Sequence, residues 1–295
     1  ATTGDNGLQF ITSGTATGNL NVNGSSFNSA RSVMLFTDIG GSGGGTVNLG
    51  NTSGNTFSQN QVNLSGGGAI EVLATGSGNA STVNTRIQGN TIVAGSGTFE
   101  GDTVVLGTTF GYAGTNNITF NGLNRIGTNG VNGSAVNPAN GSGDSAIVIT
   151  QNGTGTLNEL INNNLINDFN SSGIEIFYDA EGPSDPMGGT YHSTKTNNII
   201  IDAVGGSTGS IDFLGDDIVD TCMHISSNAL NNPAVGEYEI VIDTFQDVTS
   251  VFSVVGLGTL DESGLEMHWS ANNGGLVPVT DVRIFAVDPV MTMLG

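Results

Sequence analysis

The chain has 295 residues and a formal net charge of −21, with 26 acidic residues against five Lys and Arg. This excess argues against nucleic acid and anionic lipid as partners, because both are themselves negatively charged. Charged residues make up only 11% of the chain and apolar residues recur in short regular groups, which argues against intrinsic disorder. The 47 glycines, together with frequent Asn, predict many tight turns.

We expect a secreted, extracellular protein at a cell surface. No apolar run approaches the ~18 residues that a membrane-spanning helix needs, and no signal peptide is visible. The chain begins with Ala-Thr-Thr, as after removal of a secretion signal, although a shortened chain would begin in the same way. The single cysteine, Cys222, excludes an intramolecular disulfide, and its apolar neighbours predict a buried, unreactive thiol.

Residues 1–46 contain three short apolar groups, LQFI, NLNV and SVMLF. We interpret this segment as an N-terminal strand or cap together with the first rung of a repeat. It is the first of three predicted regions, which cover residues 1–46, 47–233 and 234–295.

The middle region repeats three kinds of short strand in a fixed order, separated by Gly, Ser and Asn-rich loops of variable length. The first kind occurs at residues 69–73, 103–106, 146–149, 173–177 and 210–214, the second at 82–87, 117–120, 157–161 and 198–201, and the third at 89–92, 123–126, 163–166 and 227–230. Constant strands with variable loops are typical of repeat architectures.

Each of these strands alternates apolar and polar residues, so each can bury only one face. A single rung of three such strands cannot shelter that face, but stacked rungs can enclose a common interior. We therefore predict an all-β protein, a parallel β-helix (β-solenoid) over residues 47–233.

Asn recurs just ahead of the apolar residue of the third strand in four rungs, at Asn90, Asn124, Asn164 and Asn228. Asn at the same bend of successive rungs can stack, each amide bonding the next one. It also accepts the left-handed backbone conformation that we expect at such a bend. The alternative is that Asn is merely frequent in this chain.

The stretches NNNLINDFNSSGIEI (162–176) and RIQGNTIVAGSG (86–97) resemble rungs of right-handed parallel β-helix proteins, the pectate-lyase-like superfamily. The resemblance covers roughly residues 47–230. It implies a fold shared by polysaccharide lyases and hydrolases, phage tailspikes, adhesins and structural solenoids. Because one fold serves all of these, function has to be argued from other residues.

After Pro233 the pattern changes. The segments GEYEIVIDTFQDVTSVFSVVG, GLEMHWSA and VTDVRIFAVDPVMTML are bulkier and lack the Asn rhythm, and we read all three as strands. Residues 234–295 are thus predicted to be a C-terminal β unit, either a cap or an assembly unit, because a solenoid end exposes strand edges and apolar interior.

The chemistry of the chain favours no enzyme. Gly215-Asp216-Asp217 resembles the paired-carboxylate element of β-helix polygalacturonases, which makes Asp216 and Asp217 the catalytic candidates, but the rest of that pattern is missing. A β-elimination lyase needs cations near its substrate, and no Lys or Arg cluster is present. The three histidines, His192, His224 and His268, lack zinc-ligand spacing.

Acidic loops are candidate Ca²⁺ sites, with plain surface charge as the alternative. The best group is Asp179, Glu181 and Asp185, followed by Asp216, Asp217 and Asp220, and then by Asp261 with Glu262. No cofactor other than Ca²⁺ is expected.

The predicted function is an extracellular structural or adhesive solenoid, a subunit of a self-assembling filament joined head-to-tail by strand addition. The donor strands would come from residues 7–12 or 279–294, and both segments could equally be intramolecular caps. The assembly residues are predicted to be Leu8, Phe10, Ile11, Val282, Ile284, Phe285 and Val287.

The alternative function is a polysaccharide-binding or polysaccharide-degrading solenoid, with glycans or a cell surface as partner. Tyr178, Tyr191 and Trp269 are its candidate sugar platforms. A third class, an ice-binding solenoid, needs a flat ladder of threonines, and segments such as TATGN and TTF do not predict one.

Overall fold

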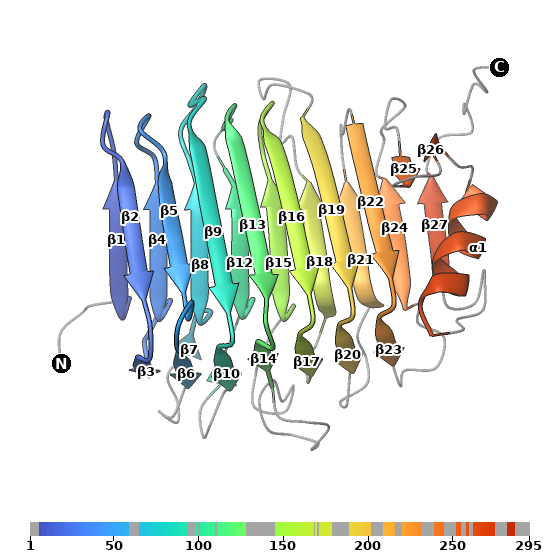
Figure 1. Cartoon of the computed structure of the whole chain (residues 1–295), viewed down its shortest axis with the longest axis horizontal. Coiled ribbons are helices and arrows are strands. Elements are labelled where there is room, and N and C mark those ends of the chain that lie inside the picture. Colours follow the sequence, from blue (N-terminus) through green and yellow to red (C-terminus); the bar gives the residue numbers. More distant parts are fainter. Residues whose placement is uncertain are drawn as a thin grey trace.

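A computed structural model gives the structure of the chain (Figure 1). The residues that it describes are 6–58, 65–93, 98–99, 101–109, 111–127, 145–167, 169, 171–178, 189–201, 209–215, 220–231, 239–244, 252–254, 258–259, 262–274 and 282–286.

Nearly all described strands belong to three parallel sheets. The first sheet contains, in spatial order, β1 (Leu8–Thr12), β4 (Leu35–Ile39), β8 (Ile70–Ala74), β12 (Val104–Thr108), β15 (Ile147–Gln151), β18 (Ser172–Tyr178), β21 (Gly209–Gly215), β24 (Ile240–Thr244) and β27 (Val282–Ala286).

The second sheet faces the viewer in Figure 1. It contains β2 (Gly18–Val22), β5 (Gly45–Leu49), β9 (Thr82–Gln88), β13 (Thr115–Asn121), β16 (Thr156–Asn162), β19 (Thr190–Thr196), β22 (Asp220–Ser226), β25 (Phe252–Val254) and β26 (Gly258–Thr259), of which β26 alone pairs antiparallel.

The third sheet is made of shorter strands. They are β3 (Ser26–Asn28), β6 (Thr56–Ser58), β10 (Thr91–Val93), β14 (Arg125–Ile126), β17 (Leu165–Asn167), β20 (Ile199–Ile201) and β23 (Ala229–Asn231). A small pair, β7 (Ser65–Gly66) with β11 (Thr98–Phe99), and one helix, α1 (Glu262–Asn272), complete the described elements.

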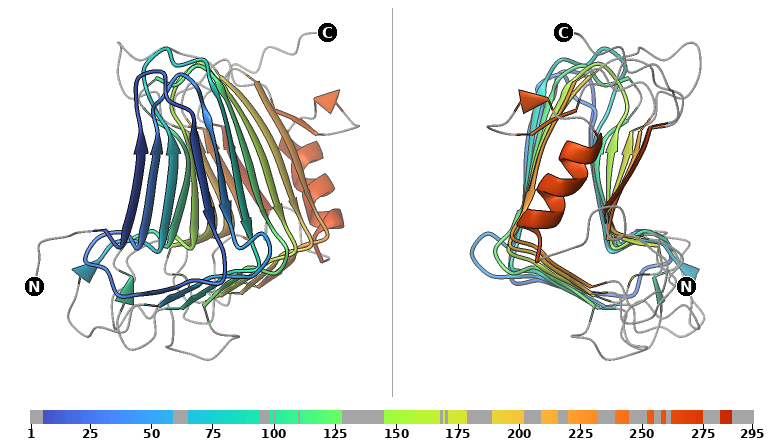
Figure 2. Two further views of the ribbon diagram at one scale, coloured as in Figure 1. Left: turned by 60° about the vertical axis from the view of Figure 1, so that its left-hand side comes forward. Right: turned by 90° about the vertical axis from the view of Figure 1, so that its right-hand side faces the viewer.

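Seen along its axis, the molecule is a three-sided coil with one sheet on each side (Figure 2). Seven successive turns, from β1–β3 to β21–β23, each contribute one strand to each sheet, so neighbours within a sheet come from successive turns of the chain. The prediction of an all-β parallel β-solenoid is confirmed.

Alternating burial explains why these short segments form strands. In β4, β5 and β8, buried and half-buried residues alternate one by one. The buried residues align from turn to turn: Leu35, Ile70, Val104, Ile147, Ile174, Ile211, Ile240 and Val282 form one continuous column in the first sheet, and none is more than 1% exposed. This shared apolar interior is what a lone turn could not provide.

The predicted Asn ladder exists and is longer than expected. It runs through Asn55, Asn90, Asn124, Asn164, Asn198, Asn228 and Asn273, and each Nδ2 donates to the next Oδ1 at 2.9–3.1 Å. Each of these amides also donates to a backbone carbonyl of the preceding turn, as Asn124 does to Ile87 at 3.0 Å. The ladder thereby satisfies buried polar groups at the bend between the second and third sheets.

One detail of the ladder prediction was wrong. The left-handed conformation belongs to the residue before the ladder Asn: φ is +65° at Leu123, +57° at Asn163 and +59° at Ser227. The ladder Asn itself lies just before the next strand and uses its side chain for hydrogen bonding. The chain bends one residue earlier, which leaves the amide aimed along the stack.

The predicted region boundaries do not coincide with breaks in the described sheets. Strand β5 extends across residue 47, and β24 and β27 continue the first sheet beyond residue 233. Strands from all three predicted regions stack in the first sheet. The division into an N-terminal unit, a solenoid and a C-terminal unit therefore stays a prediction.

The reading of GLEMHWSA as a strand was wrong, because these residues lie in helix α1. Leu265, Glu266, Trp269, Ser270 and Asn273 are all buried, and their spacing follows the 3.6-residue period of a helix. The apolar residues of this segment therefore have the period of a helix and not that of a strand.

Candidate functional site

The first candidate site is the N-terminal end of the solenoid. Strands β1, β2 and β3 are each the last strand of their sheet at this end, and no described strand lies beyond them. The interior side chains Leu8, Phe10, Leu20 and Phe27 are only partly buried here, although they pack against the core. An apolar interior and three strand edges therefore meet at one surface.

Strands β1, β2 and β3 and the loops between them carry no charge, and the nearest described charge along the chain is Arg31, after β3. Residues 6–30 contain neither an acid nor a Lys or Arg, in a chain whose net charge is −21. Native sheets commonly protect exposed edges with charged side chains or proline, and β1, β2 and β3 have neither. This surface lacks the features that keep edges apart.

The C-terminal end is built differently (Figure 2, right). Helix α1 lies across it and packs against β22 and β27, with Trp269 fully buried. Asn273, just after the helix, accepts the last bond of the Asn ladder at 2.9 Å. The second sheet ends in the antiparallel pair of β25 and β26, which interrupts its parallel stacking.

The predicted assembly residues divide between these two ends. Leu8, Phe10 and Ile11 lie in β1, and Ile11 is 53% exposed. Val282 is fully buried, and Ile284 and Phe285 belong to β27, which pairs with β24 of the same chain. Described residues 282–286 thus take the intramolecular form that was the alternative to strand donation, and Val287 lies outside the described residues.

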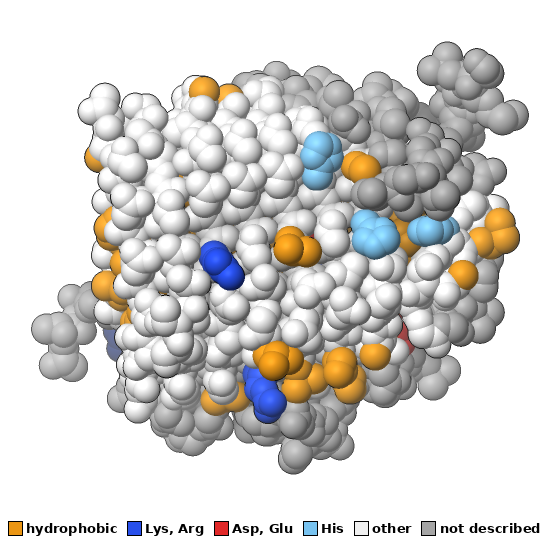
Figure 3. Space-filling model, in the orientation of Figure 1, with side chains coloured by type: hydrophobic (Ala, Val, Ile, Leu, Met, Phe, Trp, Pro, Cys, Tyr) orange, Lys and Arg blue, Asp and Glu red, His pale blue; other side chains and the backbone are white. Residues whose placement is uncertain are grey.

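The second candidate site is the outer face of the second sheet. On β9, β13, β16 and β19 no outward residue is acidic, and Arg86 is the one Lys or Arg among them. Figure 3 shows this face almost without the red of Asp and Glu. The outward side chains are Thr82, Asn84, Arg86, Gln88, Thr115, Asn117, Thr119, Asn121, Thr156, Asn158, Leu160, Asn162, Thr190, His192, Thr194 and Thr196.

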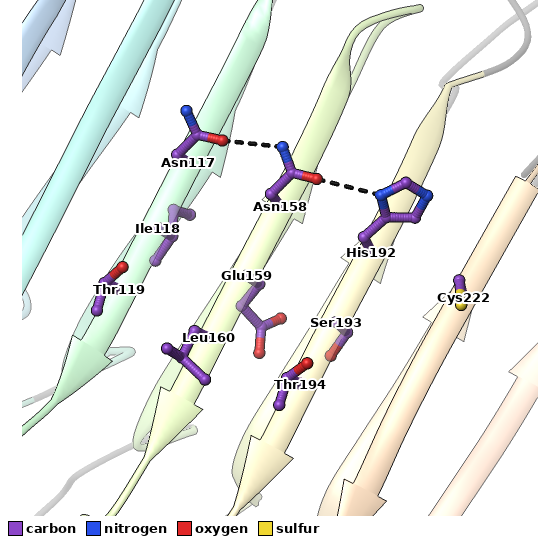
Figure 4. A pocket seen from close by; sticks show the side chains of 10 residues that line it. All are labelled: Asn117, Ile118, Thr119, Asn158, Glu159, Leu160, His192, Ser193, Thr194 and Cys222. Carbon is purple, nitrogen blue, oxygen red and sulfur yellow. Dashed lines mark hydrogen bonds between the residues drawn. The ribbon is translucent and has the colours of Figure 1, made fainter. Parts of the chain in front are cut away.

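These outward side chains stand in columns, because the strands pair without a shift in register. A second amide ladder runs along the outside: Asn117 donates to Asn84 at 2.9 Å, and Asn158 donates to Asn117 at 2.8 Å. His192 Nδ1 continues it, 3.2 Å from the Asn158 oxygen (Figure 4). Around this row is a hollow of about 450 Å³, which also reaches Thr119 and Cys222.

The expectation that no threonine ladder forms was wrong. Thr82, Thr115, Thr156 and Thr190 are register partners in four successive strands. They were overlooked because the loops between them differ in length, which hides the alignment in the sequence. In the column that contains Thr119 and Thr194, Arg86 and Leu160 interrupt the threonines.

The structure corrects the predicted environment of three side chains. Cys222 is partly exposed on the outer side of β22, beside His192 on β19, so it is not the buried thiol that we expected. Tyr191 and Trp269 are fully buried and cannot serve as sugar platforms. The side chain of Tyr178, the third platform, is outside the described part of the structure.

The catalytic and cation candidates are mostly outside the described residues. This applies to Asp179, Glu181, Asp185, Asp216, Asp217 and Asp261, while for Asp220 and Glu262 the backbone alone is described. Within the described ranges, no three His, Cys, Asp or Glu side chains gather as a metal site would require. The paired-aspartate and Ca²⁺ hypotheses therefore stay predictions.

Among the described segments, no helix has the length and apolar character needed to cross a bilayer. Comparison with known proteins adds no relative, since no family model, no curated protein and no solved structure matches the chain.

Proposed function

We propose that this protein is a structural β-solenoid of an extracellular surface, which joins a second copy of itself through its N-terminal end. The observation that carries the proposal is the contrast in charge. A chain with a net charge of −21 exposes an uncharged end, where apolar interior and strand edges are accessible together. Two such chains repel each other least at this surface.

The edge of β1 offers groups for strand addition. Leu8 N–H bonds the Met34 carbonyl of the next turn at 2.8 Å, so in a parallel ladder the N–H groups of Gln9 and Ile11 point to the free edge. The same alternation holds in β2, where the Gly18 N–H donates to the Gly44 carbonyl. The backbone N–H groups of Asn19 and Asn21 therefore point to the free edge. An added strand can take up these donors.

The form of the assembly depends on the other end. A head-to-tail filament, as expected from the sequence, needs the C-terminal end of a copy as acceptor, and there α1 and β26 would have to move. A contact between two N-terminal ends needs no such movement and closes after two copies. Paired rods are therefore the form that the closed C-terminal end favours.

A proline at the free edge tests the proposal. Ile11→Pro removes an outward N–H without touching the bonds from β1 to β4, and Ile11→Ala is the matched control that keeps this N–H. In sedimentation velocity at rising concentration, we expect the wild type and Ile11→Ala to associate and Ile11→Pro to stay monomeric. Electron microscopy then distinguishes paired rods from filaments. A wild type that stays monomeric at the highest concentration removes the self-assembly proposal.

The resemblance to pectate-lyase-like proteins fits a structural member of that group better than an enzyme. Within the described residues the interior faces are filled by packed side chains, and no acid lies on the outer face of β9, β13, β16 or β19. An enzyme that cleaves acidic polysaccharide needs carboxylates for acid–base chemistry and cations to hold its substrate.

The acid-free outer face favours a second candidate function, adhesion to a neutral polysaccharide. Its rows of hydroxyl and amide groups repeat about every 4.8 Å, and such groups both donate to and accept from sugar hydroxyls. The net charge of the chain opposes acidic glycans, whereas a neutral polymer carries no charge to be repelled. The hollow beside Asn117, Asn158 and His192 is the place where a polymer chain could sit.

Binding to insoluble cellulose and chitin, with soluble polygalacturonate as the acidic comparison, tests this candidate. The pair Asn117→Asp with Asn158→Asp places two charges in the outer ladder and should abolish retention on the neutral polymer. The pair Asn163→Asp with Asn197→Asp adds the same charge at exposed bends off this face and should leave retention unchanged. Equal retention of both pairs would argue against the face as the binding surface.

A further inference from the structure

One set of ionisable side chains lies inside the solenoid. Lys195 points into an otherwise apolar column formed by Ile87, Phe120, Ile161 and Ile225 of the neighbouring turns. Its side chain is fully buried, as is that of Glu159, on the adjacent strand β16. A lysine and a glutamate in the shared dry interior need a physical account, because burying charge is costly.

The contacts of Lys195 are closely defined. Its Nζ lies 2.8 Å from Glu159 Oε1 and 3.0 Å from Oε2, so the amine is in contact with both oxygens of the carboxyl group. Nζ also donates to Ser193 Oγ at 2.5 Å and to Tyr191 Oη at 3.0 Å. The Tyr191 hydroxyl in turn donates to Glu159 Oε2.

Burial favours the neutral form of the Lys195 amine. Desolvation lowers the pKa of Lys195, although the nearby Glu159 charge and its hydrogen bond act in the opposite direction. Desolvation, followed by the Glu159 charge, raises the pKa of Tyr191 well above its ordinary value, so this hydroxyl keeps its proton. In a neutral amine, the two N–H groups can bond Ser193 and Tyr191, which leaves the nitrogen lone pair for Glu159.

We propose that Lys195 and Glu159 condense to an amide, an internal cross-link between β16 and β19. A proton first passes from Lys195 Nζ to the Glu159 carboxylate, which gives an amine beside a carboxylic acid. The nitrogen lone pair then forms a bond to Glu159 Cδ, while the Tyr191 O–H stabilises the negative oxygen. A second proton passes from nitrogen to the carboxyl O–H, the C–O bond breaks, and one water leaves.

The reaction needs no external reagent, because one lysine amine and one carboxyl group yield one amide and one water. Its driving force is the removal of two buried charges from an apolar interior. The held geometry replaces the encounter of two separate groups. The product joins two successive turns covalently along the solenoid axis, which suits a structural role but does not depend on it.

Lys195 is the sole lysine of the chain, so a loss of lysine reactivity can be assigned to this residue. The purified wild type, incubated at neutral pH, should show an intact mass lower than its sequence mass by one water. After denaturation, an amine-reactive label should mark the N-terminal amine alone, whereas an unlinked chain takes two labels. Trypsin should fail to cut after Lys195, and the peptides that contain Glu159 and Lys195 should be recovered as one branched species.

Two variants separate the cross-link from other losses of water. Lys195→Arg keeps the charge but cannot form the amide, so its mass should equal its sequence mass. Tyr191→Phe removes the donor to the reacting oxygen and should slow condensation about 100-fold, which leaves unlinked chains in a fresh preparation. A wild type with full sequence mass and two labels overturns the proposal, as does an equal mass loss in Lys195→Arg. The wild-type measurement decides even if a variant fails to fold.

Discussion

The two ends of the solenoid solve the same physical problem in different ways. Each end interrupts the apolar columns, the Asn ladder and the hydrogen bonding of the sheets. At the C-terminal end, α1 fills the interior with Trp269, and Asn273 takes the last position of the ladder. At the N-terminal end, Phe10, Leu20 and Phe27 stay partly exposed, and the ladder begins at the backbone N–H of Ser25.

The difference shows that stacking by itself does not close a solenoid. In the first sheet the outermost strand of each end pairs in parallel with its neighbour, β1 with β4 and β27 with β24. At the C-terminal end one short helix buries Leu265 and Trp269, and Asn273 after it takes the ladder position of a further turn. Within the described residues the N-terminal end has no such element, and this contrast can be tested by matched substitutions at the two ends.

The largest expected effect is at Trp269. Trp269→Ala empties a fully buried site at the closed end and should lower the free energy of unfolding by about 3–5 kcal/mol. The matched change at the open end, Phe27→Ala, should cost less, about 1–2 kcal/mol, because this ring is partly exposed and stacks on Phe57 with ring centroids 4.8 Å apart. Urea denaturation measures both, and equal losses would contradict the contrast between the ends.

A smaller effect is expected at the ends of the Asn ladder. Asn273→Ala removes the acceptor of both the Asn228 amide and the Asn228 backbone N–H, which are buried, and should cost about 1–3 kcal/mol. Ser25→Ala, at the corresponding position of the open end, should change stability by less than about 0.5 kcal/mol, since its backbone N–H bonds Asn55 in either case. Hydrogen exchange should show lost protection in α1 for Asn273→Ala alone.

The smallest effect concerns pH near the open end. Burial first, and then the charge of Asp38, raises the pKa of Glu71 on β8 above its ordinary value of 4.5. The folded state thus binds this proton more tightly than the unfolded state, so the contribution of Glu71 to stability falls as pH rises through this range. Glu71→Gln should flatten this pH dependence in urea denaturation from about pH 4 to about pH 7.

Asp38→Asn provides the control for this pH effect. This substitution removes the charge of Asp38 and leaves the burial of Glu71, so it should weaken the pH dependence of stability without abolishing it. Complete loss of the dependence in Asp38→Asn would mean that the neighbouring charge, and not burial, dominates at this site.

Much of the fold could be predicted because its signals are local. Alternation of apolar and polar residues identified most strands of the middle region, and Asn90, Asn124, Asn164 and Asn228 marked the ladder. Asn55, Asn198 and Asn273 were missed. Residues 198–201 were assigned to the second kind of strand, whereas Ile199–Ile201 form β20 of the third sheet, and Asn273 comes just after a helix, outside the strand pattern.

The candidate sites were less predictable, because their residues meet only across turns. The segment that contains Leu8, Phe10 and Ile11 was identified as an assembly region from its apolar character, but its lack of neighbouring charge becomes meaningful only once it forms an end. The threonine column, the outer amide row and the contact between Lys195 and Glu159 depend on loop lengths that vary from turn to turn. No regular spacing in the sequence predicts these contacts between turns.

The side of each strand that faces inward follows from the amino-acid sequence, since a period of two leaves the backbone no other way to bury the apolar residues. The sequence also indicated many of the bends, through Gly and Asn, although Leu123 and Ser227 take the left-handed conformation as well. The tertiary structure decided which residues of different turns become neighbours, because register is set by the packing of whole strands and not by the number of residues between them. For that reason the interior charges, the acid-free face and the difference between the two ends emerge only in the folded coil.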